Sequence, residues 1–337
     1  MSKKDIRQAA KARAAQASGD KEAKRIAKLE AKLKEVTDER DAAEAVASEL
    51  ERQLLDERLS KFKFPKQRKG RKPTRKSYYR AVLTDTHGAS IDGPAWSAFL
   101  DDMKLLAPKE IVHMGDFVDC GGWLAEHQSM SYVGETQASY MEDIEAAQMM
   151  LDTLQEAVPA ADFHLIQGNH DARPEKWAIQ QTRRNRVDSA YLAKHVIPEN
   201  ILQLEKRGIN FYRRDTNYNG IRRNSGSIML GKCAFTHPQR ASKHHASAMA
   251  SSWGCNVVFG HTHRRDSFFE SDAQGRQWGA WNPGCLCKTQ KYYHHSENWN
   301  HSHGWHLQIV QPCGSFLGIN VPIIDGRSYM SDLLRGV

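Results

Sequence analysis

The 337-residue sequence contains few of the features that mark secreted, membrane or disulfide-stabilised proteins. No stretch approaches the roughly 18 consecutive apolar residues of a membrane-spanning helix. Residues 1–25 are rich in Lys, Ala and Arg and lack the apolar run of a signal peptide. The six cysteines form no CxxC pair and no framework spacing. We therefore expect a soluble cytoplasmic protein with reduced thiols and no membrane contact.

Acidic residues and proline are unevenly distributed, and this separates the N-terminal part from the rest. Residues 1–60 contain no proline and only one glycine, and Ala, Lys, Glu, Arg and Leu dominate them. From Ile26 the apolar residues repeat every seven positions, which predicts a helical coiled coil over 26–57 and hence a homo-oligomer. The alternative is a single amphipathic helix that folds back on the main domain.

Residues 61–76 contain no acidic residue but nine basic ones, together with two prolines and one glycine. The prolines and the glycine predict a linker. The charge predicts contact with nucleic acid, because such arms bind phosphates without sequence choice. A formal net charge of +8 over the chain agrees with a polyanionic partner. The alternative is a solvated linker that only maintains solubility, and no known nucleic-acid-reading module is recognisable.

Residues 77–327 have the pattern of an α/β domain, and residues 328–337 read as a tail. The pattern predicts strands at 79–84, 111–115 and 163–167 and helices at 96–106 and 135–157, which indicates βαβ units and a largely parallel sheet. Residues 175–208 are predicted to be helical. The later strand-like segments are 226–235, 256–259, 277–281, 306–310 and 316–324. We therefore expect a βα half followed by a β-rich half.

Polar clusters follow five of these apolar runs, where open α/β sheets usually place their chemistry. Alone, each cluster is better explained as a turn, a helix cap or a structural histidine. Oxygen and imidazole groups mixed in this way suit divalent Mn, Fe, Zn, Ni or Co. The clusters are Asp85-Thr86-His87, Gly115-Asp116-Phe117-Val118-Asp119, Gly168-Asn169-His170-Asp171, Thr236-His237-Pro238 and Gly260-His261-Thr262-His263.

The joint occurrence of the five clusters, in this order, resembles the calcineurin-like metallophosphoesterases. Their pattern is D-x-H, G-D-x-x-D, G-N-H-[DE], a lone His and G-H-x-H, and the resemblance covers about residues 78–325. It implies a four-layer α/β/β/α fold. It also implies hydrolysis of a phosphate ester by a hydroxide shared between two divalent metal ions, of which Mn is the first candidate.

The resemblance also implies a role for each matching residue. Asp85, His87 and His263 would hold one metal ion. Asn169, His237 and His261 would hold the other, and Asp116 would bridge both. His170 would protonate the leaving oxygen or stabilise the charged transition state, and the Asp119 carboxylate would orient its ring.

Some positions depart from the resemblance or extend it. Cys120 stands where phosphoprotein phosphatases carry a phosphate-binding arginine, which argues against that identity. Arg173 could supply a replacement guanidinium, although a surface salt bridge would explain it equally well. Arg264 could also meet substrate phosphates, or be an ordinary exposed arginine. The histidine-rich loop at 294–306 reads as a lid or surface loop rather than a third metal site. Residues 123–136 look like an insertion that sets substrate choice.

These features predict a metal-dependent phosphoesterase, and the basic segment favours a phosphodiester in nucleic acid as the substrate. One alternative is a phosphomonoesterase that acts on a phosphoprotein or a nucleotide. The other is a coiled-coil scaffold with a vestigial phosphoesterase domain, which is disfavoured because none of the implied ligands is missing.

Overall fold

The computed structural model describes residues 76–120, 139–181, 186–214, 226–238, 242–289 and 300–335, with isolated positions between 28 and 53. The chain divides into two compact units, Met1–Lys63 and Phe64–Val337. The isolated positions of the first unit, Leu33 and Val36 among them, are helical. Most of the heptad segment 26–57, almost all of the basic segment 61–76 and the stretch 123–136 lie outside the described residues. Of the predicted histidine-rich loop 294–306, residues 294–299 also lie outside them, and the prediction of a loop was wrong for residues 304–306, which begin strand β10 (Gly304–Val310).

The first sheet of the second unit has seven strands in the order β12-β11-β10-β1-β2-β3-β4. Four of them are parallel neighbours: β1 (Tyr78–Leu83), β2 (Glu110–His113), β3 (Asp162–Ile166) and β4 (Ile209–Tyr212). The others, β10 (Gly304–Val310), β11 (Phe316–Ile324) and β12 (Arg327–Ser328), extend the sheet in antiparallel fashion. The predicted βα half therefore forms the parallel part, and the last strands return to pair beside β1.

The second sheet has five strands in the order β5-β6-β7-β9-β8. They are β5 (Ser227–Leu230), β6 (Cys233–Thr236), β7 (Val257–Phe259), β8 (Arg265–Ser271) and β9 (Gln277–Pro283). The single strand predicted at 226–235 was wrong, because Gly231, at φ 63°, turns the chain between β5 and β6. Strands β4 and β8 were not predicted.

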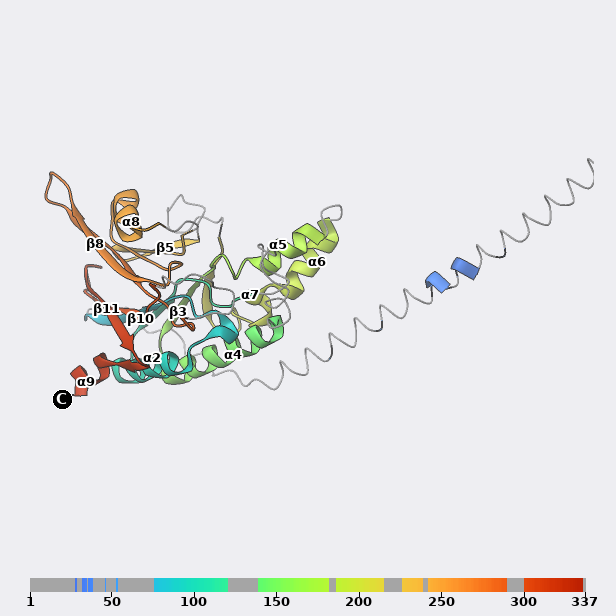
Figure 1. Ribbon diagram of the computed structural model, residues 1–337, viewed down its shortest axis with the longest axis horizontal. Helices are drawn as coiled ribbons and strands as arrows, with labels where there is room; N and C mark the ends of the chain where they lie inside the picture. The colour runs from blue at the N-terminus through green and yellow to red at the C-terminus, as the bar shows by residue number, and fades with distance from the viewer. Residues whose placement is uncertain are drawn as a thin grey trace, which may run out of the picture. The chain divides into compact units, whose positions relative to one another are not determined.

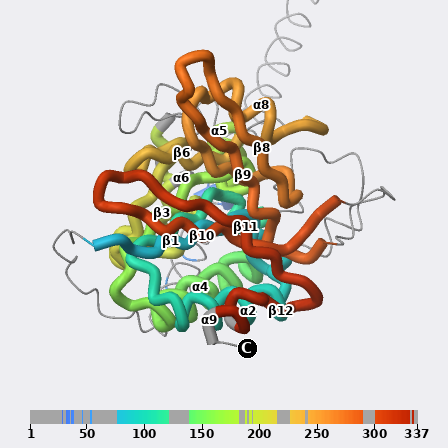
Figure 2. The backbone as a smooth tube through the Cα atoms, turned by 90° about the vertical axis from the view of Figure 1, so that its left-hand side faces the viewer, coloured from blue at the N-terminus to red at the C-terminus, as the bar shows by residue number. Residues whose placement is uncertain are grey.

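The two sheets face each other and helices cover their outer faces (Figures 1 and 2). Val82 and Ile166 of the first sheet share a buried core with Phe235 and Val258 of the second. Helices α2 (Gly93–Leu106) and α4 (Tyr140–Ala157) lie on the first sheet, and α8 (His245–Trp253) packs on the second. This four-layer α/β/β/α arrangement confirms the predicted fold class.

Local sequence explains where the covering helices begin and end. Asp92 caps α2 by accepting a hydrogen bond from the Ala95 amide, and Ala107 ends the helix in the left-handed region. Ser139 caps α4 in the same way. Both helices present one apolar stripe to the sheet, since Phe99, Met103 and their neighbours are buried.

The remaining helices are η1 (Gly88–Ser90), α5 (Arg173–Gln181), α6 (Arg186–Val196), α7 (Pro198–Ile201) and α9 (Tyr329–Arg335). The fold continues past residue 327, because β12 pairs with β11 and the Ser328 hydroxyl donates to the buried Asp102 carboxylate of α2. Within the described part of the chain, no helix combines the length and apolarity needed to cross a membrane.

Candidate metal centre

The five polar clusters meet at one edge of the two facing sheets. Each cluster begins within two residues of the end of a strand, namely β1, β2, β3, β6 and β7 in chain order. Backbone hydrogen bonds join the first two clusters: the Asp85 amide donates to Gly115 and the His87 amide to Asp116, each at 3.0 Å. The segments that carry the predicted ligands are therefore fixed to one another by the backbone.

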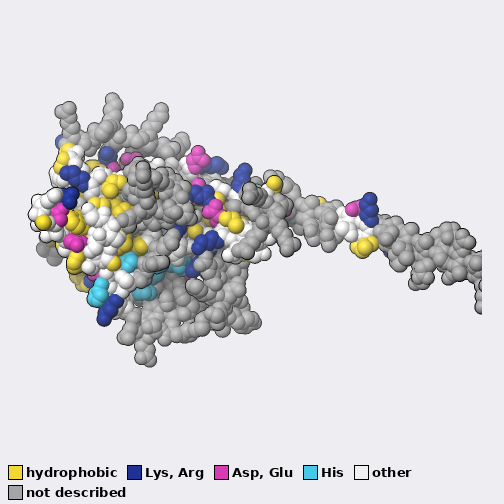
Figure 3. Space-filling view, turned by 90° about the horizontal axis from the view of Figure 1, so that it is seen from above, with side chains coloured by type: hydrophobic (Ala, Val, Ile, Leu, Met, Phe, Trp, Pro, Cys, Tyr) yellow, Lys and Arg dark blue, Asp and Glu magenta, His cyan; other side chains and the backbone are white. Residues whose placement is uncertain are grey.

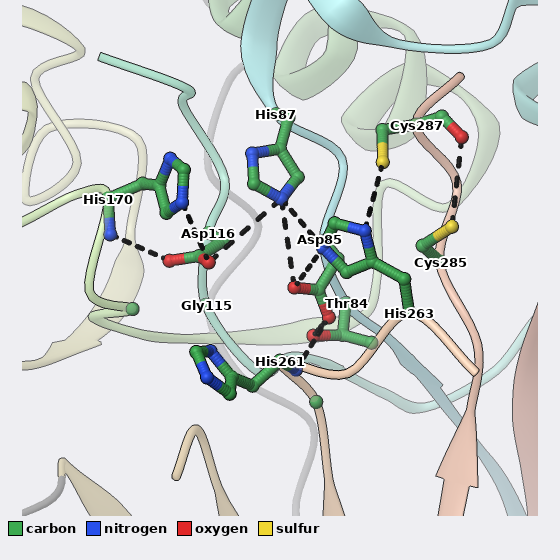
Figure 4. Close-up of polar contacts among 12 residues, drawn as sticks. Thr84, Asp85, His87, Gly115, Asp116, His170, His261, His263, Cys285 and Cys287 are labelled. Carbon is green, nitrogen blue, oxygen red and sulfur yellow. Dashed lines mark hydrogen bonds and ion pairs between the residues drawn. The ribbon is translucent and has the colours of Figure 1, made fainter. Parts of the chain in front are cut away.

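Asp85, His87 and His263 form the first set of donor atoms (Figure 4). The His263 Nε2 atom lies 3.1 Å from Asp85 Oδ1 and 3.0 Å from His87 Nε2. Two ring nitrogens this close need a shared proton or a shared cation between them. All three side chains are nearly or fully buried.

Asn169, His237 and His261 form the second set. The Asn169 Oδ1 atom lies 3.0 Å from His237 Nε2 and 2.9 Å from His261 Nδ1. Asp116 faces both sets, because its Oδ2 atom lies 3.2 Å from His237 Nε2 and 3.9 Å from His87 Nε2. The structure thus brings together all seven residues that the sequence predicted as ligands.

Neighbouring groups direct lone pairs into the cluster, as metal ligation requires. His87 Nδ1 lies 2.7 Å from Asp119 Oδ1, and His237 Nδ1 lies 3.0 Å from the Met114 carbonyl oxygen. With the Nδ1 protons donated to these acceptors, the neutral rings would present both Nε2 lone pairs to a cation. Asp85 Oδ1 is buried and makes no hydrogen bond of good geometry, although His263 Nε2 lies 3.1 Å away, and a cation between the two would satisfy both. The residues therefore fit divalent cations.

Unusual backbone geometry permits this convergence. Among the described non-glycine residues, nine have positive φ, and five of these are predicted ligands: Asp85, His87, Asp116, His261 and His263. Glycine is needed beside them. A Cβ atom at Gly168 would stand 2.1 Å from the Asp116 amide, and one at Gly260 would stand 2.1 Å from Thr84 Oγ1. Strained conformations of this kind persist only where the surroundings over-determine them.

The carboxylates of Asp85 and Asp116 stay ionised because histidines surround them. Burial alone would raise the pKa of Asp116, yet His237 and His170 outweigh it and hold this pKa well below the usual range. Burial is likewise outweighed at Asp85, where His263 keeps the pKa low. Burial lowers the pKa of His261 to about 4, so its ring is neutral and able to ligate.

A hydrogen-bonded group lies beside Asp116 and consists of Asp119, His170 and Arg173. His170 Nδ1 lies 2.7 Å from the Asp119 carbonyl oxygen and 3.0 Å from its Oδ1 atom. Arg173 donates to the carbonyl oxygens of Asp119 and Cys120, and its Nη2 atom lies 3.3 Å from His170 Nε2. Asp119 thus contacts both His170, as predicted, and the ligand His87, which was not predicted.

Arg264 is engaged away from this cluster. Its Nη2 atom donates to the Lys243 carbonyl oxygen at 2.7 Å and lies 3.8 Å from Asp266. The predicted phosphate contact at Arg264 therefore stays a prediction, whereas Arg173 does lie beside the candidate site.

Two buried aspartates hold the site together without having been assigned a role from the sequence. Asp171 accepts from the amides of Val118 and Gly168. Asp143, on α4, accepts from the amides of Ala89 and Cys120. Burial raises the pKa of each to about 6. The signal for Asp143 was an acidic residue on the apolar stripe of a helix, next to Ile144 and in line with Ala147.

The comparisons with known proteins address the family directly. The model of the calcineurin-like phosphoesterase superfamily domain matches residues 80–296, more than half of the chain. No curated protein matches the chain significantly.

The solved structures to which the chain is similar include three of low sequence identity. Vacuolar protein sorting 29 from Cryptosporidium parvum is 13% identical, with 75% of this chain and 95% of that chain covered and a TM-score of 0.36. The E. coli phosphoesterase Yfce is 15% identical, with 72% and 98% covered and a TM-score of 0.31. Pseudomonas putida nuclease MPE is 12% identical, with 71% and 87% covered and a TM-score of 0.27. On the family match, the chain belongs to the calcineurin-like phosphoesterase superfamily and is a metal-dependent phosphoester hydrolase.

Proposed function

We propose that this protein hydrolyses phosphodiester bonds in nucleic acid with two divalent metal ions. The observation that carries the two-ion part is the shared position of Asp116 Oδ2, within 4 Å of nitrogen donors from both sets. Two ions bound there would supply Lewis-acid chemistry: a lower pKa for a bound water and charge neutralisation on the phosphoryl oxygens. Mn²⁺ is the first candidate, and Fe, Zn, Ni or Co would suit the same donors.

In this proposal the chain's own residues have distinct tasks. Asp116, whose Oδ2 atom faces donors of both sets, would help to hold both ions. The His170 Nε2 atom lies 3.8 Å from Asp116 Oδ2. In this proposal it faces the place where a leaving oxygen would depart. Asp119 fixes the ring through Nδ1, and Arg173 adds a guanidinium beside Nε2. Together they can transfer a proton or balance charge at that oxygen.

The substrate class rests on the basic segment 61–76, which would retain a polyanion beside a site that cleaves phosphate esters. On the face that Figure 3 shows, Lys and Arg side chains lie near the visible histidine side chains. Cationic groups there suit an extended polyanion. A phosphomonoesterase acting on a phosphoprotein or nucleotide is the competing hypothesis, and Cys120 in place of an arginine disfavours the phosphoprotein.

Activity assays with Mn²⁺ test the proposal directly. The full-length protein is offered labelled DNA, labelled RNA, cyclic nucleotides and p-nitrophenyl phosphate, with His170→Ala as the control for contaminating activity. We expect cleavage of at least one nucleic acid. Turnover of the small esters alone would refute the nuclease, and inactivity on every substrate would favour the scaffold.

A further inference from the structure

A cysteine lies against one of the proposed ligands. The Cys287 Sγ atom stands 3.9 Å from His263 Nδ1, and both side chains are buried. Figure 4 shows the sulfur on the side of the imidazole that faces away from Asp85. The ring is therefore held between a sulfur atom at Nδ1 and the first donor set at Nε2.

The position of the ring proton follows from this geometry. If His263 offers its Nε2 lone pair to a cation, the proton of the neutral imidazole must be on Nδ1. That N–H then donates to the sulfur of Cys287. Histidine ligands usually donate to a carboxylate, a backbone carbonyl or water. In this chain His87 and His237 follow that habit, through Asp119 and the Met114 carbonyl, whereas His263 has a sulfur acceptor.

The backbone of Cys287 is fixed to the same donor set. Its amide donates to the Asp85 carbonyl oxygen at 3.1 Å. Its own carbonyl oxygen accepts from His303 Nε2 at 2.8 Å and from the Cys285 thiol at 3.7 Å. An isolated antiparallel β-bridge between the backbones of Cys287 and Ile91 adds a further constraint. Cys287 contacts Asp85 through its backbone amide and His263 through its sulfur. A shift of Cys287 would therefore change the distance between these two proposed ligands.

We propose that Cys287 is a positioning residue that orients His263 through an N–H···S hydrogen bond and thereby sets the metal affinity of the first donor set. This inference rests on the proposed ligand role of His263. The buried sulfur contributes as an acceptor and touches no substrate. Removing the acceptor frees the ring to rotate and leaves the Nδ1 proton without a partner, so the affinity for one ion falls while the other set is unaffected.

Calorimetric titration of the metal-free, full-length protein with Mn²⁺ tests this without reference to activity. For Cys287→Ala we expect one of the two dissociation constants to rise about 10- to 100-fold, the usual effect of losing an outer partner of a ligand. Cys287→Ser, whose hydroxyl still accepts, should recover most of the affinity. Cys285→Ala removes a buried sulfur from the same loop and one weak hydrogen bond to the Cys287 carbonyl, but it leaves the His263 contact, so it should lose far less affinity than Cys287→Ala.

Several results would overturn the inference. Wild-type affinity in Cys287→Ala would do so, and so would an equal loss in Cys285→Ala, which would reveal a general loop effect. If the alanine variant does not fold, nitrogen-detected NMR of the wild type loaded with Zn²⁺ decides: a proton on Nε2 of His263 contradicts the proposal, and one on Nδ1 supports it. A wild type that binds no Mn²⁺ or Zn²⁺ would refute the metal centre itself, which is a different failure.

Discussion

At the scale of single residues, Asp116 and His170 are adjacent but separable. Asp116 Oδ2 faces donors of both sets. His170 donates its backbone amide to Asp116 at 2.8 Å, and its ring is bound through Nδ1 to Asp119 and stands 3.8 Å from Asp116 Oδ2. Substitution of Asp116 should remove a proposed metal ligand, whereas substitution of His170 should remove only a proton donor or a charge. Metal content and turnover therefore respond differently to the two substitutions.

We predict that His170→Ala still binds two Mn²⁺ ions per chain but loses about 10²- to 10⁴-fold in turnover, the usual contribution of a general acid. Asp116→Asn should bind fewer than two ions, because an amide cannot supply a charged oxygen to both. Plasma emission spectroscopy after dialysis and the assay on the best substrate measure the two effects. Two ions in Asp116→Asn, or full turnover in His170→Ala, would contradict these roles.

The pH dependence of metal binding should reflect the His263 ring. Burial lowers the pKa of His263, but Asp85 and Cys287 outweigh it and raise this pKa to about 9 in the metal-free protein. Below pH 9 a cation must displace the ring proton, so affinity should rise with pH, by up to about tenfold per unit, and level off above 9.

Titration calorimetry with Mn²⁺ at pH 6.5, 7.5 and 8.5 checks this prediction, and buffers with different ionisation enthalpies count the protons. At least one proton should be released per chain at pH 7.5. His261 should contribute none, because its pKa is already low. Affinity that stays constant over this range would contradict the assignment of His263 as a ligand.

The sequence predicted which residues meet at the candidate site better than it predicted the residues that support them, for a physical reason. Ligands such as Asp85 and His263 occur in short motifs whose spacing is set by the chemistry of the site. Supports such as Asp143 and Cys287 act through backbone amides or a single ring nitrogen, and many sequences could provide such a contact. The place of Asp143 on the apolar stripe of α4 signals that it is buried, but it does not specify that its carboxylate accepts from the amide of Cys120. Such partners depend on how α4 packs and emerge only in three dimensions.

At the scale of elements, the sequence predicted those with a clear apolar pattern and missed those without one. Strands β1 to β3 were predicted because their apolar runs are buried on both faces. Strand β8 escaped detection because it is an edge strand with mostly exposed residues, Phe269 included, and no alternating pattern. Helix α8 was missed because its short run of Ala and Ser has only a weak apolar stripe.

The close packing of the loops after β2 and β3 gives a prediction at this scale. Gly168→Ala would place a Cβ 2.1 Å from the Asp116 amide nitrogen and Oδ1, atoms that cannot withdraw without moving a ligand. We expect a loss of about 1–3 kcal/mol in the free energy of unfolding, as for other overpacked sites, together with loss of bound Mn²⁺. Urea unfolding and metal analysis measure the two effects.

Gly93→Ala is the matched control, since a Cβ at Gly93 meets nothing within 4 Å. Position 93 begins α2, and alanine is a better helix former than glycine. The Gly93→Ala variant should therefore unfold at the same urea concentration as the wild type or at a slightly higher one. If Gly168→Ala were as stable as Gly93→Ala and kept its metal, the loops would be less tightly coupled than the structure indicates.

At the scale of the whole molecule, the N-terminal segment should determine the oligomeric state. The heptad pattern over 26–57 predicts self-association. Removing residues 1–60 should therefore convert an oligomer into a monomer in size-exclusion chromatography with light scattering. The truncated protein should retain its Mn²⁺ content, because the second unit contains all seven proposed ligands. An unchanged oligomeric state would favour the single helix folded back on the domain.

The basic segment should determine how salt affects nucleic-acid binding. Each phosphate contact contributes about −0.7 to the slope of log K against log salt for single strands and about −0.9 for duplex DNA. Replacing Lys66, Arg68, Lys69, Arg71 and Lys72 by Gln should flatten the slope by up to about 4. Fluorescence anisotropy with a labelled oligonucleotide, in the His170→Ala background so that the substrate survives, measures the slope.

The matched control replaces the same number of basic residues in the N-terminal segment that is predicted to be helical, namely Lys21, Lys24, Lys28, Lys32 and Lys34. Because Gln is also a good helix former, this variant loses equal charge with little effect on the predicted helix. Equal flattening in both variants would mean that net charge alone attracts the polyanion. Flattening confined to the 61–76 variant would locate the phosphate contacts in the segment that leads directly into β1. No flattening in either variant would leave the polyanion without a binding arm and favour a small phosphate ester as the substrate.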